Sequence, residues 1–185
     1  MSQKAIFLDR DGVINVDHAY VHKREDFQFI EGVFEACQYF IAQGYIIVVV
    51  TNQSGIGRGY YTEAQFNVLS QWMCEEFAKR DVAISKVYFC PHHPSKAEPE
   101  YLVDCQCRKP RAGMLMQAIN EFDIKVENSV MVGDKVSDIQ AARSAGVKTA
   151  ILVESGQAFD KATMETADFV CSSLNKVPSI LSSIS

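Results

Sequence analysis

The stretch that decides the fold is an apolar run followed at once by charged residues, Ala5-Ile6-Phe7-Leu8-Asp9-Arg10-Asp11-Gly12. Residues 5–8 are short and apolar, which is typical of a strand buried on both faces. Comparable runs lie at residues 45–50, 86–89, 129–132 and 149–153. Together these runs predict the strands of a central parallel sheet.

Stretches with helical periodicity lie between most of these runs, at residues 33–42, 63–79, 113–122 and 137–145. Parallel neighbours need a crossover long enough to hold a helix, so the alternation predicts an α/β fold with a doubly wound parallel sheet. The length of 185 residues fits one domain over residues 1–185. We expect residues 182–185 to form a frayed tail.

Composition limits the partners and the location. The 18 Lys and Arg against 23 Asp and Glu give a net charge of -5, which predicts neither a nucleic-acid nor a membrane partner. Residues 1–8 do not read as a signal peptide, and no apolar run reaches membrane-spanning length. We therefore expect a cytoplasmic monomer whose six cysteines are core residues or metal ligands rather than disulfides.

Polar residues follow three of the predicted strands at the edge where ligands bind in open α/β sheets. Asp9 and Asp11 follow the first strand, Thr51 begins the run Thr51-Asn52-Gln53-Ser54-Gly55 after the second, and Gly133-Asp134-Lys135 follows the fourth. Taken alone, each has an ordinary explanation, such as a turn with solvated carboxylates. Their convergence predicts one site.

Two further groups complete the pattern. Lys109, next to Arg108, would add a fixed positive charge to the site, although an exposed basic pair is the commoner fate of such residues. Asp134 and Asp138 would supply hard oxygen ligands for magnesium, and Asp138 could equally stabilise the first turn of a helix.

In this order the motifs resemble those of the haloacid dehalogenase superfamily, and the match spans residues 6–138. The resemblance implies a Rossmann-like core without a large cap and hydrolysis through an aspartyl-phosphate intermediate. It implies that Asp9 is the nucleophile and a magnesium ligand, and that Asp11 is the general acid and base. It also implies that Thr51 and Lys109 bind phosphate, and that Asp134 and the backbone carbonyl of Asp11 bind magnesium. Asp138 is expected to lie behind these groups and to contact them rather than the ion.

Three stretches resemble one part of that superfamily more closely, at residues 7–12, 51–55 and 105–110. They are similar to the D-glycero-D-manno-heptose-1,7-bisphosphate 7-phosphatases, which act in ADP-heptose and lipopolysaccharide core precursor biosynthesis, and to the related histidinol-phosphate phosphatases. The substrate implied is a small phosphorylated sugar. The residues expected to bind it are Asp17, Tyr20, Asn52, Gln53, Ser54, Arg58, Arg108 and Lys135, and Lys135 could instead pair with Asp9.

A second metal site is predicted within residues 90–107. Cys90, His92, Cys105 and Cys107 make two close pairs of thiol and imidazole ligands, which is the composition of a closed structural zinc site. Buried thiols beside reactive surface cysteines would be the plain alternative, and the family resemblance favours zinc. The expected task of the ion is to staple the long loop and so to fix Arg108 and Lys109.

Three rival functions remain at this stage. A histidinol-phosphate phosphatase would run the same chemistry on another substrate, but the predicted zinc loop is long for that group. A phospho-acceptor signalling domain would share the sheet and a phosphorylated aspartate, yet it needs neither an acid at Asp11 nor a zinc loop. A catalytically dead zinc-binding interaction module is disfavoured because all four motifs are intact.

Overall fold

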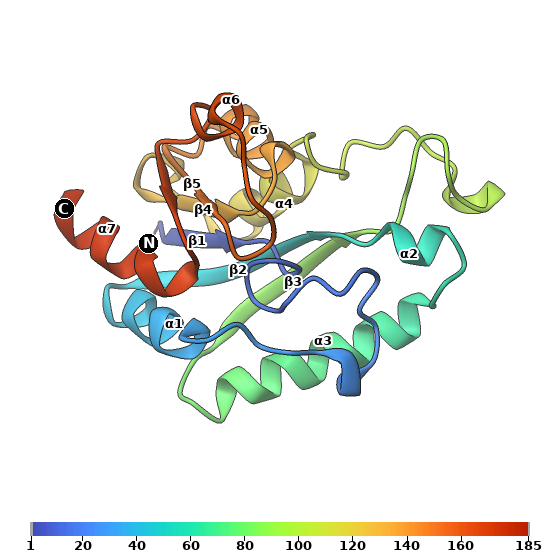
Figure 1. Cartoon of the computed structure of the whole chain (residues 1–185), viewed down its shortest axis with the longest axis horizontal. Coiled ribbons are helices and arrows are strands. Elements are labelled where there is room, and N and C mark those ends of the chain that lie inside the picture. The colour runs from blue at the N-terminus through green and yellow to red at the C-terminus, as the bar shows by residue number, and fades with distance from the viewer. Residues whose placement is uncertain (1, 185) are drawn as a thin grey trace.

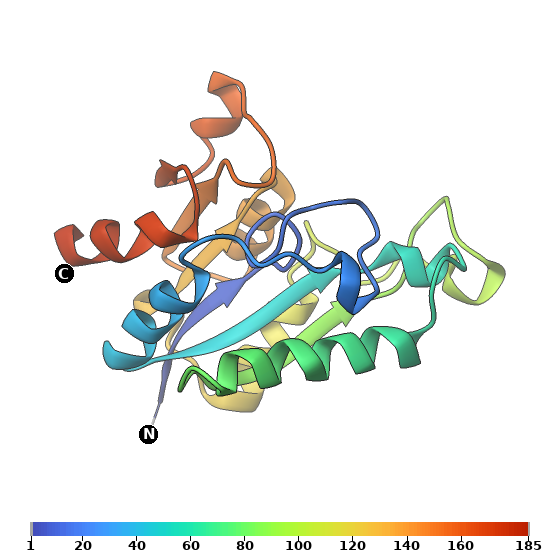
Figure 2. The same cartoon turned by 60° about the horizontal axis from the view of Figure 1, so that its bottom comes forward.

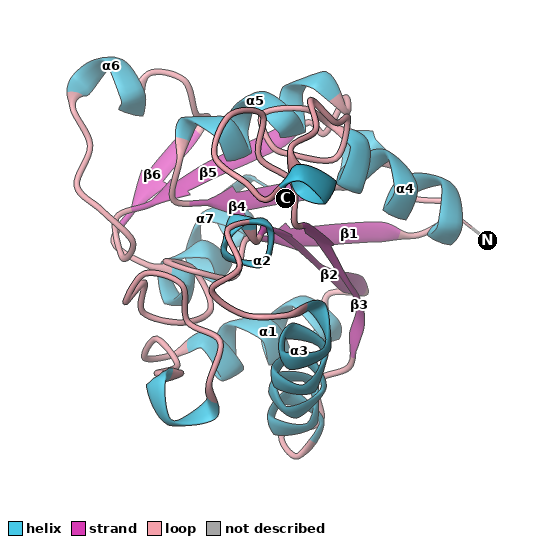
Figure 3. Ribbon diagram, turned by 90° about the vertical axis from the view of Figure 1, so that its right-hand side faces the viewer, coloured by secondary structure: helices cyan, strands magenta, loops and turns pink. Residues whose placement is uncertain are grey.

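Six parallel strands form one sheet in the computed structural model, which describes residues 2–184. The strands are β1 (Lys4–Leu8), β2 (Tyr45–Asn52), β3 (Ile84–Cys90), β4 (Val130–Gly133), β5 (Thr149–Val153) and β6 (Phe169–Cys171). Their order across the sheet is β3-β2-β1-β4-β5-β6; Figure 1 labels the first five of these, and Figure 3 also labels β6. The strand order reverses between β1 and β4, so their carboxyl ends open onto the crevice where such folds bind ligands.

Helices cover both faces of the sheet (Figures 1 and 3). The helices α1 (Val33–Ala42), α3 (Glu63–Ala78) and α7 (Val177–Ile184) share one apolar core with the sheet, and α4 (Gly113–Phe122) and α5 (Val136–Ser144) share the other. The remaining turns of helix are short: η1 (Arg24–Asp26), α2 (Ser54–Gly57), η2 (Pro99–Tyr101), η3 (Val126–Asn128), α6 (Lys161–Met164) and η4 (Leu174–Lys176).

The central strand β1 is buried on both sides, because successive side chains of a strand point to opposite faces. Ile6 and Leu8 belong to the core beneath α1 and α3, whereas Ala5 and Phe7 belong to the core beneath α4 and α5. All four residues have 0% exposure. This burial fixes the end of the strand, and with it the backbone that carries Asp9.

The predicted α/β fold with a parallel sheet is confirmed. Two helices have the predicted bounds, α1 and α4, and the five predicted strands all exist. The sequence analysis missed β6, α2, α6 and α7, three of which are only three or four residues long. The expected frayed tail was wrong, since α7 continues to Ile184 and packs Leu181 into the core, while Ser185 lies outside the described residues.

Two long connections reach the ligand-binding edge of the sheet. The loop after β1 contains η1, and the loop between β3 and α4 contains η2 and extends past α2 in Figure 2. The second loop is tied to its surroundings, because the Glu98 N–H donates to the Gly57 carbonyl at 2.7 Å and the Tyr101 hydroxyl donates to Glu63 at 3.3 Å. Both loops contribute side chains to the pocket at this edge of the sheet.

Candidate active site

Asp9 stands directly after β1, at the carboxyl end of the sheet. Its backbone N–H donates to the Val132 carbonyl of the neighbouring strand at 3.1 Å, and its side chain is 8% exposed. Its Oδ1 atom accepts from the Arg10 N–H at 2.8 Å. The carboxylate is thus held by the backbone in a fixed place at the floor of a pocket.

Asp134 follows β4 and faces the same point. It is 1% exposed, and neither of its carboxylate oxygens has a hydrogen-bond partner among residues 2–184. Glycines allow this close approach, since a Cβ atom on Gly12 or Gly156 would lie 2.4 or 2.0 Å from Asp134 Oδ2. A buried carboxylate without a donor is costly, so the residue is arranged for a cation.

Asp9, Asp134 and Asp138 each offer one carboxylate oxygen, and these three atoms lie within 4.8 Å of one another. Burial, followed by the negative charge of Asp9, raises the pKa of Asp134 to about 8. A divalent cation would reverse this effect by favouring the ionised carboxylate. The cluster therefore fits a hard cation such as magnesium.

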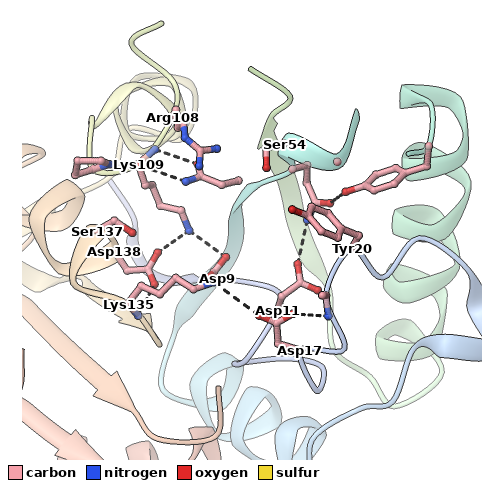
Figure 4. Close-up of a pocket in the computed structure, with 16 residues that line it drawn as sticks. Asp9, Asp11, Asp17, Tyr20, Ser54, Arg108, Lys109, Lys135, Ser137 and Asp138 are labelled. Carbon is pink, nitrogen blue, oxygen red and sulfur yellow. Dashed lines mark hydrogen bonds and ion pairs between the residues drawn. The ribbon is translucent and has the colours of Figure 1, made fainter. Parts of the chain in front are cut away.

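Lys109 is buried, and Figure 4 shows its side chain reaching between Asp9 and Asp138. Its Nζ atom lies 3.0 Å from Asp9 Oδ1 and 2.6 Å from Asp138 Oδ1, and it donates to the Val50 carbonyl at 2.8 Å. The ammonium group is thus held by two ion pairs and one hydrogen bond. Burial acts to lower the pKa of Lys109, but the charges of Asp138 and Asp9 outweigh it and raise that pKa above its ordinary value.

Both carboxylate oxygens of Asp138 already contact other groups of the protein. Its Oδ2 atom accepts from the backbone N–H groups of Asp134 and Lys135, both at 3.1 Å, at the start of α5, and its Oδ1 atom pairs with Lys109. The position of Asp138 behind the metal ligands remains a prediction, because its oxygen also belongs to the cluster that could hold a cation. Gly133 is required beside it, because a Cβ atom there would lie 2.2 Å from the Asp138 Cβ atom.

Thr51 and Asn52 end β2 with different tasks. Thr51 is fully buried, and its hydroxyl oxygen accepts from Gln53 at 2.9 Å. Asn52 makes two reciprocal hydrogen bonds with the backbone of Lys109, at 3.1 and 3.0 Å. The side-chain amide of Asn52 therefore holds the lysine segment.

The Asp11 carboxylate accepts three hydrogen bonds. Arg10 and Asn15 donate to its Oδ1 atom at 2.9 and 3.0 Å, and Gln53 donates to its Oδ2 atom at 3.1 Å. Burial acts to raise the pKa of Asp11, but the charge of Arg10 and these hydrogen bonds outweigh it and lower that pKa below its ordinary value. The side chain remains 18% exposed and faces the pocket.

A pocket of about 550 Å³ joins these groups to solvent. Of the predicted site residues, those that line it are Asp9, Asp11, Asp17, Tyr20, Asn52, Gln53, Ser54, Arg108, Lys109 and Lys135. Thr51 and Asp134 lie buried next to it. Arg58 does not line it and instead lies over the ring of Tyr20, 5.8 Å from the centroid.

An ion pair with Asp9 was one of the two predictions for Lys135. The ammonium group of Lys135 pairs with Asp17 instead. Its Nζ atom lies 3.8 Å from Asp17 Oδ2 across the mouth of the pocket. The ion pair joins the loop after β1 to the start of α5. Arg108 lies on the opposite rim in Figure 4 and donates to the His92 carbonyl at 3.4 Å.

The predicted zinc ligands form one cluster. Cys90, His92, Cys105 and Cys107 each offer a ligand atom, and all four atoms lie within 4.8 Å of one another. Cys107 Sγ lies 3.4 Å from both Cys105 Sγ and His92 Nδ1. Three thiols and one imidazole at such distances could hold zinc.

Sequence reasoning missed several residues around the pocket. Tyr61 and Ser137 line it, and the segment after β5 supports it through Ser155, which donates to the Gly12 carbonyl at 2.7 Å, and Gln157, which donates to the Asp134 carbonyl at 2.8 Å. No motif marks these residues. The strand-end rule would have pointed to the segment after β5, because β5 ends at the same edge of the sheet.

Comparison with known proteins finds hydrolases that are similar to this chain. A family model described as HAD-hydrolase-like matches residues 106–177. The chain is 48% identical over 97% of its length to the D-glycero-beta-D-manno-heptose-1,7-bisphosphate 7-phosphatase of Pasteurella multocida, and it covers 97% of that protein. It is 52% identical over 83% of its length to the D-glycero-alpha-D-manno-heptose-1,7-bisphosphate 7-phosphatase of Campylobacter jejuni, of which it covers 84%.

A solved structure is similar along the whole chain. The D,D-heptose 1,7-bisphosphate phosphatase from B. bronchiseptica, crystallised with magnesium and phosphate, superposes with a TM-score of 0.84 and 30% identity, covering 99% of this chain and 100% of that one. The fold and the site thus define a hydrolase of the haloacid dehalogenase class. Within that class, the chain belongs to the family of the D-glycero-D-manno-heptose-1,7-bisphosphate 7-phosphatases.

Within residues 2–184, no helix has both the length and the apolar character needed to cross a membrane.

Proposed function

We propose that the protein is a magnesium-dependent phosphatase that removes the 7-phosphate of D-glycero-D-manno-heptose 1,7-bisphosphate, in the biosynthesis of ADP-heptose and lipopolysaccharide core precursors. The observation that carries the proposal is the floor of the pocket. There Asp134, a buried carboxylate without a hydrogen-bond partner among residues 2–184, lies near Asp9, which pairs with the buried ammonium of Lys109. Asp11 lines the same pocket. The names of similar relatives supply the sugar.

Asp9 is the nucleophile in this proposal. One of its oxygens bonds to phosphorus while the bond from phosphorus to the sugar oxygen breaks, which leaves a phosphoryl group on Asp9. Lys109 supplies a fixed positive charge beside the transferring group. Thr51 can donate its hydroxyl proton to a phosphate oxygen, because its own oxygen already accepts from Gln53.

Asp11 is the general acid and the general base in this proposal. Its proton passes to the leaving sugar oxygen, and its carboxylate then takes a proton from the water that hydrolyses the phosphoryl-aspartate. The lowered pKa of Asp11 favours the ionised form in the free protein. A phosphate dianion bound beside it favours the protonated form, since a neighbouring like charge disfavours ionisation.

Asp9, Asp134 and the backbone carbonyl of Asp11 would hold magnesium. When bound, the ion neutralises negative charge on the phosphoryl group and on the two carboxylates. The protein's own share is the rigid placement of those carboxylates at the ends of β1 and β4.

The second phosphate of the substrate would bind at the rim. Arg108 and Lys135 are the cations that line the pocket above its floor, and Asp17, Tyr20 and Ser54 offer polar groups to sugar hydroxyls. Asn52 and Gln53 face protein groups, so we assign them to the support of the site. Arg58 reaches the rim only through Tyr20.

Substrate choice is tested by measuring kcat/KM in parallel for heptose 1,7-bisphosphate, heptose 7-phosphate and histidinol phosphate. Both anomers of the bisphosphate belong in the series, because the relatives' names include both. We expect the bisphosphate to be preferred, since binding energy from the distal phosphate can be used in the transition state. Arg108→Ala should reduce the preference over the monophosphate. If histidinol phosphate is the best substrate, the sugar is wrong and the phosphatase stands.

We infer one domain over residues 1–185, a monomer, and a structural zinc ion within residues 90–107. A reducing cytoplasm is the compartment in which three unpaired thiols of this cluster would persist.

A further inference from the structure

We propose that Gln53, held in place by Tyr61, is a positioning residue that aims one particular oxygen of Asp11, Oδ2, at the leaving-group oxygen of the substrate. The inference rests on the proposed function, in which Asp11 is the general acid. It goes beyond that function by selecting the oxygen that carries the proton and by giving a task to Tyr61, which lies outside the motifs.

The hydrogen bonds of Asp11 identify the oxygen. Each carboxylate oxygen can accept two hydrogen bonds through its lone pairs. Oδ1 already accepts two, from Arg10 and Asn15, whereas Oδ2 accepts one, from Gln53. The lone pair that remains is on Oδ2, and Asp11 lines the pocket.

The orientation of the Gln53 amide follows from its neighbours. An ionised carboxylate only accepts hydrogen bonds, so the group that faces Asp11 must be the amide NH₂, which also donates to Thr51 at 2.9 Å. Both amide protons are then used. The amide oxygen, Oε1, is left facing the Tyr61 hydroxyl, which donates to it.

Tyr61 is a rigid anchor for this amide. It is 4% exposed, and its ring stacks on the His22 ring with a centroid distance of 4.8 Å and an interplanar angle of 4°. Gly55 permits this position, because a Cβ atom there would lie 2.3 Å from the Tyr61 ring. Burial raises the pKa of Tyr61 to about 12, so its hydroxyl keeps the proton that it donates.

The chain of bonds therefore runs from Tyr61 through Gln53 to Asp11. When the bond between phosphorus and the sugar oxygen breaks, the proton on Asp11 Oδ2 passes to that oxygen, which leaves as an alcohol. Oδ2 later takes a proton from the attacking water. Gln53 touches neither the sugar nor the phosphorus in this scheme, and its effect on the reaction passes through the direction of Oδ2.

The test is the dependence of kcat/KM on the leaving group, measured with a series of aryl and alkyl monophosphates. An alkoxide leaving group needs the proton from Asp11, whereas p-nitrophenolate does not, and kcat/KM reports only the steps up to phosphoryl transfer to Asp9. The variants are Tyr61→Phe, which removes one hydroxyl, and Gln53→Leu, which removes the amide. Tyr60→Phe is the matched control, since Tyr60 is a neighbouring tyrosine that is 54% exposed.

We expect kcat/KM for the alkyl esters to fall about 10-fold in Tyr61→Phe and about 100-fold in Gln53→Leu, with p-nitrophenyl phosphate changed by less than about 3-fold. The Tyr60→Phe control should match the wild type with every ester. A purely structural or phosphate-binding role would lower kcat/KM equally for all esters, and that result would overturn the proposal.

Asp11→Asn separates this inference from the proposed function. It should show the strongest dependence on the leaving group. If Asp11→Asn shows it and the Gln53 and Tyr61 variants do not, the positioning role is wrong while the acid role of Asp11 stands. If Asp11→Asn treats all esters alike, the acid role in the proposed function is wrong, and the positioning role falls with it.

Discussion

Asp134 illustrates how a single side chain can oppose stability in favour of function. It is buried without a hydrogen-bond partner, and its pKa is raised to about 8 by burial and then by the charge of Asp9. The folded protein therefore holds a proton there that the unfolded chain has already lost at neutral pH. Between the ordinary value of 3.8 and about 8, this difference makes stability fall as pH rises.

Asp134→Asn should consequently stabilise the magnesium-free protein at pH 8. An amide cannot ionise, so the melting temperature should rise by about 2–4 °C for each kcal/mol recovered. Magnesium should raise the melting temperature of the wild type and leave that of the variant unchanged. Asp26→Asn, at an exposed position, is the control. A variant less stable than the wild type at pH 8 without magnesium would refute this account of Asp134.

Asp9→Asn should keep the fold and lose several orders of magnitude in kcat, because the attacking carboxylate and a charge of the metal site disappear together. The folded state can be checked by circular dichroism, and turnover by phosphate release. Near-normal turnover by the pure variant would contradict the assignment of the nucleophile.

Which residues meet at the site could be predicted, because each follows a strand of one parallel sheet and such strands end at one edge. The hydrogen-bond partners of each side chain could not be predicted. The bonds of Asn52 to the Lys109 backbone, and of Gln53 to Asp11 and Tyr61, join segments up to 57 residues apart. No local sequence pattern shows these long-range contacts, so the sequence alone predicts that Asn52 and Gln53 bind substrate.

The loop between β3 and α4 is an element whose order would depend on its metal. Its described residues include three of the four candidate zinc ligands, His92, Cys105 and Cys107, and only one turn of 3-10 helix, η2. The fourth, Cys90, is the last residue of β3. Arg108 and Lys109 follow the last ligand directly, so the position of the loop is transmitted to the pocket.

Cys105→Ser should reduce the zinc content from about one ion per chain and lower the melting temperature. Cys74→Ser is the matched control, because Cys74 is a half-buried free cysteine on α3 that lies outside the cluster. Elemental analysis and a thermal melt measure the two effects. Active wild-type protein without zinc, together with a neutral Cys105→Ser, would remove the zinc assignment.

Long periodic elements were predictable and short ones were not. The predicted helices of α1 and α4 coincide with the observed ones, because ten residues show the helical period clearly. By contrast, β6 has three residues, all half-buried, and it is recognisable only by its pairing with β5. Short elements of this kind are specified by their neighbours.

For the molecule as a whole, strand order determines where chemistry can occur. The strands β1 and β4 are adjacent in the sheet but far apart in the sequence, and their ends bring Asp9 and Asp134 together. The two long loops and the start of α5 then form the rim, where Arg108 lies on the loop between β3 and α4 and Lys135 lies at the start of α5. This division predicts that the floor performs the phosphoryl transfer and that the rim selects the substrate.

The most direct test of that claim is to follow heptose 1,7-bisphosphate by ³¹P NMR in the presence of magnesium. We predict that the 7-phosphate signal is replaced by inorganic phosphate while the 1-phosphate signal persists, and that Asp9→Asn releases no phosphate. Loss of the 1-phosphate instead, or release by Asp9→Asn at the wild-type rate, would contradict the account.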